Sequence, residues 1–312
     1  MKIVLTRITL FIACIIFFAA FLVSCTKEST SVSEGPDTKP DPNEYTPVTV
    51  TSDWYEVTYI SPKTYVIKEP SSSQLNNSYL LLGDDEAFLL DTGSGENTPK
   101  NGSKMKHLID QITDLPVTLL LSHFHFDHNQ NIGEFERVAF PDLPFLRDSV
   151  SADSIYNFTS EDLFYGSQPD KTKVSRWLPL NTEVDLGGRV VQFVNLPGHT
   201  DESTIIIDKT NRMVFLGDYL YNGALFVFDE EDLSIYETSV AFLKANISSE
   251  YRLYGAHGTP KIPYNRLQML EGLLGCIETN ACQPSSVTVF GYPAKYYTYD
   301  MAGMVVLDMS SE

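Results

Sequence analysis

One segment constrains the fold of this 312-residue chain more than any other: residues 121–128 read Leu-Ser-His-Phe-His-Phe-Asp-His. Directly after an apolar run, six residues contain four potential metal ligands, which are His123, His125, Asp127 and His128. Two histidines that bind one metal from a helix are four residues apart, so this spacing predicts a loop. His123 and His125 can point the same way from extended backbone, while Asp127 and His128 turn toward a neighbouring position. The segment therefore predicts a site for two adjacent metal ions.

Three further candidate ligands follow predicted strands in the same manner. His199 comes after an apolar run and a Pro-Gly turn, and Asp218 and His257 each come shortly after an apolar run and a glycine. Side chains at strand ends can converge on one rim of a sheet. These ligands use five of the six histidines, and the sixth, His107, is expected to be a solvated residue on a helix.

Short apolar or alternating runs separated by Gly, Pro, Asn and Asp predict more strands than helices. The strands are predicted at Tyr55–Ile60, Tyr65–Lys68, Ser78–Leu82, Ala87–Leu90, Val117–Leu121, Val190–Asn195, Thr204–Ile207, Met213–Leu216, Tyr251–Tyr254 and Val287–Phe290. Helical spacing of apolar residues predicts helices at residues 105–112 and 267–277, and a third after a capping box of Ser234 and Glu237. Two or more sheets with helices outside them fit this mixture better than regular βαβ alternation.

Together the motifs resemble those of the metallo-β-lactamase-fold hydrolases, over nearly all of residues 51–312. Five motifs occur in the family's order: Leu90-Asp91-Thr92-Gly93, the His123–His128 segment, Pro197-Gly198-His199-Thr200, Gly217-Asp218 and Gly255-Ala256-His257-Gly258. The resemblance implies an α/β fold, an αββα four-layer sandwich with the metals at one edge of its two β-sheets. It also implies the metal ligands: His123, His125 and His199 at one metal, Asp127, His128 and His257 at the other, and Asp218 bridging the two. Asp91 would orient the ligand loop from behind.

The same residues indicate a branch of the family. Members that hydrolyse β-lactams typically lack an aspartate at the bridging position, so Asp218 favours the branch resembling glyoxalase II, lactonases and related esterases. A Cys-Gly-Arg-like segment is expected after that aspartate in glyoxalase II, whereas residues 219–222 read Tyr-Leu-Tyr-Asn, which disfavours glutathione thioesters. Tyr221 matches a tyrosine with which lactonases steady the substrate oxygen, and packing is the equal alternative. His125 excludes the flavodiiron branch, which has a glutamate there.

The ligand set predicts the chemistry. All seven ligands are nitrogen or oxygen donors, so zinc is expected at both sites, with iron or manganese tolerable at one. Two such ions acidify a shared water, leaving hydroxide to attack a carbonyl or phosphoryl centre. Asp127 would orient this nucleophile and accept its proton, and Tyr221 would donate to the oxyanion.

The leading prediction is therefore a dinuclear-metal hydrolase that cleaves ester, lactone or thioester bonds of a small-molecule substrate. Two alternatives stay open at this point. One is a phosphodiesterase or sulfatase that uses the same site, and the other is a non-catalytic metal-binding surface lipoprotein. The complete ligand set argues against the second alternative.

The N-terminal residues predict export and a membrane anchor. Lys2 and Arg7 precede an uncharged apolar stretch that ends in Leu22-Val23-Ser24-Cys25, which resembles the lipobox of bacterial lipoproteins. Residues 1–25 are thus expected to be a signal peptide with Cys25 as the lipidated residue, which places the protein in the cell envelope, outside the cytoplasm. An uncleaved signal anchor is the alternative. Residues 26–50, rich in Ser, Thr and Pro, predict a disordered tether, and 51–312 one domain.

Charge and the remaining motifs complete the prediction. The formal charge is −19, and removal of Lys2 and Arg7 with the signal peptide leaves 20 basic against 41 acidic residues, or −21, which disfavours nucleic acid as a partner. Cys276 and Cys282 predict a disulfide outside the cytoplasm, with two unrelated apolar side chains as the alternative. The aromatic-rich stretch 140–177 predicts either a lid over the metals or a subdomain with its own core.

Overall fold

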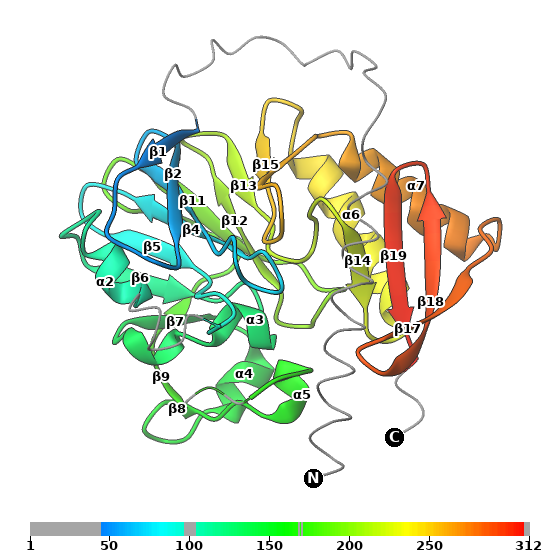
Figure 1. Cartoon of the computed structure of the whole chain (residues 1–312), viewed down its shortest axis with the longest axis horizontal. Coiled ribbons are helices and arrows are strands. Elements are labelled where there is room, and N and C mark those ends of the chain that lie inside the picture. Colours follow the sequence, from blue (N-terminus) through cyan, green and yellow to red (C-terminus); the bar gives the residue numbers. More distant parts are fainter. Residues whose placement is uncertain (1–44, 97–103, 168, 170, 309–312) are drawn as a thin grey trace.

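The computed structural model describes residues 45–96, 104–167, 169 and 171–308 (Figure 1). The predicted signal peptide, Cys25 and most of the predicted tether lie outside these residues. Strand β1 (Thr46–Val48) pairs antiparallel with β2 (Glu56–Ser61). The predicted start of the domain at residue 51 is therefore too late. The strand was missed because it is three residues long and contains Pro47, which an edge strand tolerates.

The first sheet has nine strands in the order β1-β2-β3-β4-β5-β6-β7-β9-β8. Its strands are antiparallel from β1 to β5 and parallel from β5 through β6 and β7 to β9. The other bounds are β3 (Thr64–Lys68), β4 (Asn77–Leu82), β5 (Ala87–Leu90), β6 (Val117–Leu120), β7 (Val138–Pro141), β8 (Ile155–Tyr156) and β9 (Thr172–Leu178). The parallel part carries its polar ligand loops at one edge, as the sequence predicts.

The second sheet has six strands in the order β10-β11-β12-β13-β15-β16. Their bounds are β10 (Glu183–Asp185), β11 (Val190–Asn195), β12 (Thr204–Asp208), β13 (Met213–Phe215), β15 (Arg252–Tyr254) and β16 (Lys261–Ile262). Between the two sheets lies a buried core in which Phe88 meets Phe193 and Tyr79 meets Phe215, with ring centroids 5.0 and 4.9 Å apart. Burial of these large side chains holds the sheets face to face.

Helices cover the outer faces of both sheets. Helices α2 (Met105–Ile109), α4 (Pro144–Ser149) and α5 (Ser160–Leu163) pack on the first sheet, and α6 (Asp232–Asn246) and α7 (Arg266–Glu278) on the second. This arrangement confirms the predicted αββα sandwich. The capping box is wrong, because α6 begins before Ser234, and the Ser234 hydroxyl donates to the carbonyl of Glu231. Helix α2 is also shorter than predicted and leaves Ile112 outside it.

A third sheet lies beside α7, and although the strand at Val287–Phe290 was predicted, its pairing into this sheet was not. It has the order β14-β19-β18-β17, with bounds β14 (Ala224–Val227), β17 (Ser285–Val289), β18 (Tyr292–Tyr299) and β19 (Ala302–Leu307). Figure 1 shows it at the right of the molecule, with α7 beside it. Met304 and Val306 pack into the core with α7, while Val305 and Leu307 face a separate apolar cluster. The two faces of this sheet therefore pack against different apolar clusters.

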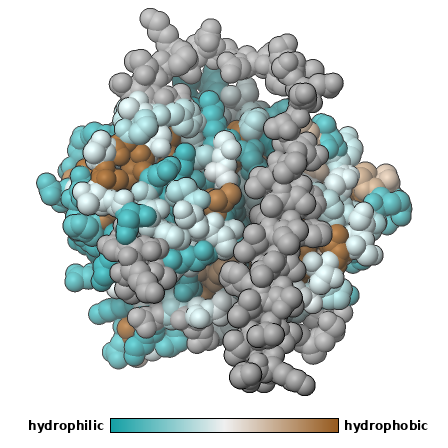
Figure 2. All heavy atoms as spheres, in the orientation of Figure 1, coloured by the Kyte–Doolittle hydropathy of each residue, from teal (hydrophilic) through white to brown (hydrophobic). Residues whose placement is uncertain are grey.

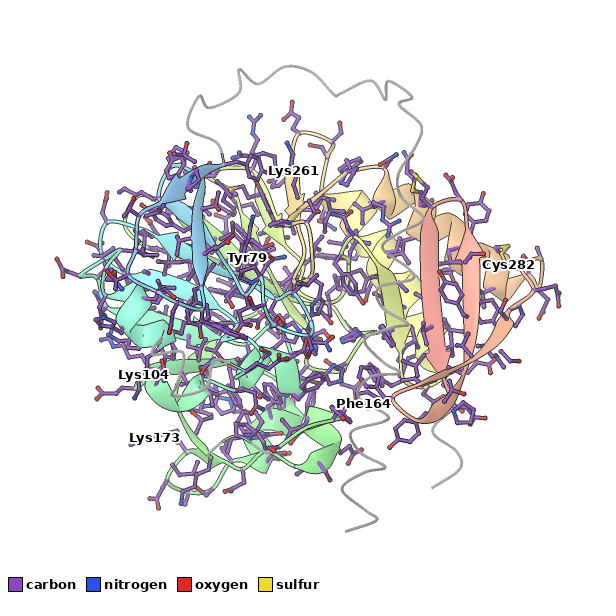
Figure 3. All side chains as sticks on the ribbon, in the orientation of Figure 1. Tyr79, Lys104, Phe164, Lys173, Lys261 and Cys282 are labelled. Atoms are coloured by element: carbon purple, nitrogen blue, oxygen red, sulfur yellow. A yellow bond between two sulfur atoms is a disulfide. The ribbon has the colours of Figure 1, made fainter. Side chains whose placement is uncertain are left out.

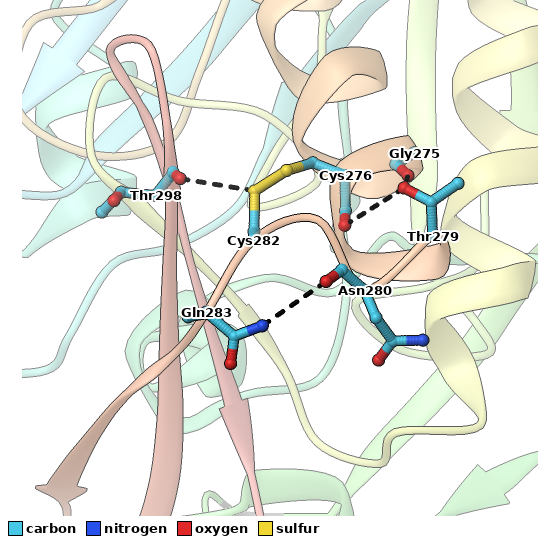
Figure 4. Close-up of a disulfide and its surroundings, with 7 residues drawn as sticks. All are labelled: Gly275, Cys276, Thr279, Asn280, Cys282, Gln283 and Thr298. Carbon is cyan, nitrogen blue, oxygen red and sulfur yellow. Dashed lines mark hydrogen bonds between the residues drawn. A yellow bond between two sulfur atoms is a disulfide. The ribbon is translucent and has the colours of Figure 1, made fainter.

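A disulfide joins Cys276 in α7 to Cys282 in the turn before β17, which confirms the predicted pairing (Figure 4). The Cys282 sulfur also lies 3.7 Å from the carbonyl oxygen of Thr298 in β18. The bond thus ties the end of α7 to the third sheet.

The surface shown in Figure 2 is mostly hydrophilic, with hydrophobic residues in several separate patches. Isolated exposed apolar residues of this kind are ordinary for a folded domain. In the part of the chain that the structure describes, no helix is both long enough and apolar enough to span a membrane.

Candidate metal centre

All seven predicted ligands lie at the ends of strands on one rim of the sandwich. His123 and His125 follow β6, His199 follows β11, Asp218 follows β13 and His257 follows β15. Asp127 and His128 lie in α3 (Phe126–Asn129), a single helical turn, so the predicted loop is wrong for these two. The turn places Asp127 and His128 beside His257, at a second position next to that of His123 and His125.

The first cluster consists of His123, His125 and His199. Nε2 of His123 is 3.0 Å from Nδ1 of His125, and Nε2 of His199 is 3.1 and 3.0 Å from these two atoms. Burial lowers the pKa of all three histidines, so the rings are neutral near pH 7. Three neutral imidazoles that direct nitrogens at one point form a typical set of zinc ligands.

The second cluster consists of Asp127, His128 and His257. Oδ2 of Asp127 is 3.5 Å from Nε2 of His128 and 3.5 Å from Nε2 of His257. Burial acts to lower the pKa of His128, but the nearby carboxylates of Asp127 and Asp218 outweigh it and raise the pKa above its ordinary value. The second cluster therefore combines imidazole and carboxylate donors, whereas the first contains imidazoles alone.

Asp218 lies between the two clusters. Its Oδ2 is 3.7 Å from Nε2 of His199, and its Oδ1 is 2.9 Å from Nε2 of His257 and 3.4 Å from Nε2 of His128. Oδ2 also lies 3.0 Å from Nε2 of His257, so this oxygen reaches both clusters while Oδ1 faces the second. Gly217 permits this placement, since its φ is +53° and a Cβ atom there would lie 2.6 Å from that of Ser122.

The donor set fits two metal ions. Nε2 of His128 and Oδ1 of Asp218 are buried, and neither atom takes part in a hydrogen bond of acceptable geometry, although Nε2 of His257 lies 2.9 Å from Oδ1. An orphaned buried polar atom is costly in a folded protein, and a cation coordinated by both atoms would remove this cost. His123, His128 and Asp218 also form a third possible ligand group that overlaps the two clusters, which shows how close the two positions are.

Asp91 contacts one candidate ligand, His128, and also Ser122, which precedes the ligand segment. Its carboxylate accepts hydrogen bonds from the Ser122 backbone N–H at 2.6 Å and the Ser122 hydroxyl at 2.8 Å. Its Oδ2 also lies 2.9 Å from Nδ1 of His128. When Nδ1 of His128 carries the ring proton and donates it to Asp91, Nε2 is the atom left to act as a metal ligand. Asp91 itself has a φ of +66°, a conformation that aspartate tolerates better than most residues.

Backbone carbonyls orient two more histidines. Nδ1 of His199 lies 3.0 Å from the carbonyl oxygen of Phe226, and Nδ1 of His257 lies 2.9 Å from that of Gln74. Each contact leaves Nε2 directed at the metal positions. Phe226 and Gln74 are distant from these histidines along the chain, so the fold itself sets the ring orientations.

Sequence reasoning missed Asn76. Its side-chain amide donates to the carbonyl oxygen of Asp127 at 2.9 Å and to the Asp127 carboxylate at 3.2 Å. The residue is buried and forms an isolated bridge with His257. In the sequence only its position next to a strand marked Asn76. Asparagine is common in such turns, so this position did not single it out.

Aromatic side chains line one side of the pocket above the ligands. We call them the aromatic wall, which consists of Phe126, Phe164, Phe226, Phe228 and Phe290. Gln74 and Tyr221 border the pocket elsewhere, and no lysine or arginine is found among the lining residues that the structure describes. The pocket is thus acidic at the metal positions and apolar beside them.

The aromatic-rich stretch 140–177 was predicted to form either a lid over the metals or a subdomain with its own core. Phe140, Tyr156 and Phe158 pack with Phe124 in a buried cluster, with ring centroids 4.8 to 5.4 Å from that of Phe124. Phe164 instead lines the metal pocket. These buried rings belong to the core of the first sheet and not to a separate core, which contradicts the subdomain alternative, while Phe164 places one residue of the stretch in the pocket lining.

Tyr221 lines the pocket, but its hydroxyl donates to the carbonyl oxygen of Ala224. Its ring meets that of His257 edge-on, with the centroids 4.9 Å apart. Burial and the charge of Asp218 raise its pKa, so the hydroxyl stays protonated. His107 lies exposed on α2, away from the centre, as predicted.

The metallo-beta-lactamase superfamily model matches residues 74–257, which is 184 of 312 residues. The chain belongs to the metallo-β-lactamase superfamily. The matched range contains every ligand described above, from the Asn76 turn to His257. The superfamily membership expected from the five motifs is therefore confirmed.

Two relatives illustrate its place in the superfamily. The chain is 25% identical over 197 residues to the acyl-coenzyme A thioesterase MBLAC2 of Bos taurus, which covers 55% of this chain and 69% of that protein. It is 27% identical over 154 residues to the probable metallo-hydrolase YqgX of Bacillus subtilis, covering 48% of this chain and 68% of that protein. Both names are those of hydrolases.

Solved structures show the same fold. A beta-lactamase domain protein from Burkholderia ambifaria superposes with a TM-score of 0.54 at 18% identity, covering 75% of this chain and 79% of that one. A metallo-beta-lactamase from Pontibacter korlensis gives a TM-score of 0.51 at 18% identity, with 71% and 99% covered. At such identity the likeness concerns the fold alone.

Proposed function

We propose that this protein is a dinuclear-metal hydrolase of ester, lactone or thioester bonds. The observation that carries the proposal is the position of Asp218 between the two ligand clusters, with its carboxylate 3.7 Å from Nε2 of His199 and 2.9 Å from Nε2 of His257. A bridging carboxylate suits two ions held side by side. Zinc is the metal proposed at both positions, because all donors are imidazole nitrogens and carboxylate oxygens.

Two bound ions would supply a nucleophile at neutral pH and stabilise the negative charge that develops on the substrate oxygen. The chain's own residues would place and accept protons. Asp127, which Asn76 holds by two hydrogen bonds, is proposed to accept the proton of the attacking water. Tyr221 is proposed to donate to the substrate oxygen after its hydroxyl exchanges the Ala224 carbonyl for that oxygen.

The pocket supports an acyl substrate over a phosphate or sulfate ester. An anionic ester would gain from a lysine or arginine at the pocket, and the described lining contains neither. Removal of the predicted signal peptide leaves a formal charge of −21, from 20 basic and 41 acidic residues, which repels polyanions at long range. The relationship to a named thioesterase supports thioesters among the acyl candidates.

Metal analysis and a substrate panel test the proposal together. Elemental analysis of protein purified without chelator should give two metals per chain. The panel contains chromogenic esters, lactones, thioesters, phosphodiesters, sulfate esters and β-lactams, assayed with zinc-loaded protein. The acyl substrates should be hydrolysed fastest, Asp218→Ala should lose the activity and part of the metal, and the exposed His107→Ala should change neither.

Three outcomes would contradict the proposal. Efficient cleavage of phosphodiesters or sulfate esters with no acyl hydrolysis would favour the alternative hydrolase. Two bound metals with no turnover of any panel substrate would favour a metal-binding protein without catalysis. One metal or none, with no effect of Asp218→Ala, would refute the dinuclear centre.

Tyr221→Phe measures the role of the Tyr221 hydroxyl separately. We expect kcat on the best acyl substrate to fall by no more than about 10²–10³, the usual cost of one lost oxyanion donor. An unchanged kcat would assign the hydroxyl to its bond with Ala224 alone.

We further propose that the protein is anchored in the bacterial cell envelope through lipid on Cys25. The support is the order of basic residues, apolar run and Leu-Val-Ser-Cys at the N-terminus. Cys25→Ala should release the protein from the membrane fraction or block its maturation. Normal anchoring and processing of this variant would refute the lipid anchor.

A further inference from the structure

Two residues of the aromatic wall have backbone conformations that phenylalanine rarely adopts. The φ of Phe164 is +58° and that of Phe290 is +53°. Positive φ is unfavourable for a bulky side chain and persists where the surrounding structure requires it. Such strain is concentrated at functional sites, and both of these residues line the metal pocket.

The geometry of the turn at residue 290 does not explain why a phenylalanine is found there. Val289 of β17 pairs with Tyr292 of β18, so Phe290 and Gly291 form a two-residue hairpin loop. Both have positive φ, +53° and +92°, as a type I′ turn requires. Asn-Gly is the preferred pair in such a turn. The phenylalanine is therefore explained by what its side chain contacts.

The Phe290 ring reaches the segment that follows α5. Its centroid is 5.3 Å from that of Phe164 and 5.5 Å from that of Tyr165, and Figure 3 shows Phe164 between α5 and the third sheet. Phe164 in turn contacts Phe228 just after β14, with the centroids 4.6 Å apart. Three segments far apart in the sequence thus meet in one apolar surface, and each of these phenylalanines is only partly buried.

The wall borders the first ligand cluster. The ring of Phe228 lies 4.7 Å from His125 and 5.3 Å from His199, and that of Phe164 lies 5.9 Å from His125. Tyr221 instead contacts His257 of the second cluster. An apolar group bound to the wall would therefore lie on the side of the first cluster.

We propose that Phe164, Phe228 and Phe290 bind the apolar acyl chain of the substrate and set the chain length that the enzyme prefers. The proposal rests on the acyl hydrolysis proposed above and adds the substrate class: neutral esters, lactones or thioesters of medium or long aliphatic acids. Binding of the chain covers apolar ring surface that is otherwise partly exposed, which favours longer chains.

Phe290→Asn tests the proposal with little risk to the fold, because asparagine is favoured at this turn position. We compare kcat/KM for p-nitrophenyl acetate and decanoate in wild type, Phe290→Asn and Phe145→Asn. Phe145 is 45% exposed on α4 and lies outside the pocket lining, so its variant should behave as wild type. The ratio of kcat/KM for decanoate to kcat/KM for acetate should fall at least tenfold in Phe290→Asn, a change of about 1.4 kcal/mol. An unchanged ratio would overturn the proposal.

A binding measurement separates this proposal from acyl hydrolysis. If zinc-loaded wild type hydrolyses no ester of any length, the proposed function fails, and the wall is tested with the uncharged apolar dye N-phenyl-1-naphthylamine. The dye should bind wild type and Phe145→Asn equally and Phe290→Asn at least fivefold more weakly. Equal binding to all three proteins would overturn the apolar site as well.

Discussion

Asp91→Asn should weaken metal binding at the second cluster while leaving the backbone unchanged. Asparagine has nearly the same shape as aspartate and tolerates a positive φ such as the +66° of Asp91. Its Oδ1 can still accept the Ser122 backbone N–H. Its NH2 group, however, would replace Oδ2, which now faces the Ser122 hydroxyl and Nδ1 of His128.

The magnitude follows from the proton on His128. With a proton on Nδ1 donated to Asp91, Nε2 carries the lone pair that would bind a metal. An amide NH2 at that place cannot accept, so Nδ1 becomes the acceptor and the proton moves to Nε2. Loss of such a partner typically lowers metal affinity by about 10–100-fold, which is about 1.4–2.7 kcal/mol. Asp91→Ala should cost more, since alanine fits this φ poorly.

Competition with a zinc chelator gives the two metal affinities. The affinity for the more weakly bound zinc should be lower in Asp91→Asn than in wild type by the predicted factor. The stability of the metal-free protein should differ little between the two. His107→Ala, which removes an exposed histidine, is the control for nonspecific binding. Equal affinities for both metals in wild type and Asp91→Asn would refute the tautomer argument.

Three further predictions concern stability. Arg189→Met should lower the free energy of unfolding by about 3–5 kcal/mol in chemical denaturation, because it leaves the carboxylate of Asp208, which is 0% exposed, without its oppositely charged partner. Replacing Cys276 and Cys282 by serine should cost about 2 kcal/mol, the entropy of a short closed loop, with metal content unchanged. Burial raises the pKa of Glu69 from 4.5 to about 7, so its contribution to stability is complete below pH 4.5 and is lost as pH rises through about 7. Glu69→Gln should flatten the pH dependence of unfolding in this range.

The clustering of the candidate ligands could be predicted from the sequence because their signal is local. Each one follows a short apolar strand, and the strand ends lie on one rim. All ten predicted strands exist, several with their bounds shifted by one or two residues at an end. The capping box failed because Ser234 and Glu237 have the correct spacing but lie one turn inside α6, where the acidic residues at 231 and 232 begin the helix.

Other parts of the site could not be predicted because their signal is not local. Asn76 acts on Asp127 from 51 residues away, and nothing near Asn76 distinguishes it from an ordinary turn residue. The third sheet was missed for a related reason. Its strand β14 pairs in parallel with β19, almost 80 residues later, so neither strand shows its partner in its own sequence.

The candidate metal ligands and the aromatic wall come from different parts of the chain, which explains why the chemistry is easier to predict than the substrate. The metal ligands occupy short motifs at strand ends, whereas the aromatic wall joins α3, the segment after α5, the region of β14 and the β17–β18 turn. Changes at the last three places would alter the pocket without touching a ligand. Under the proposed function, a chain could therefore retain the metal centre while residues that no metal motif contains set its acyl preference. Phe290 illustrates this best, because the turn alone would favour asparagine and only the pocket accounts for the ring.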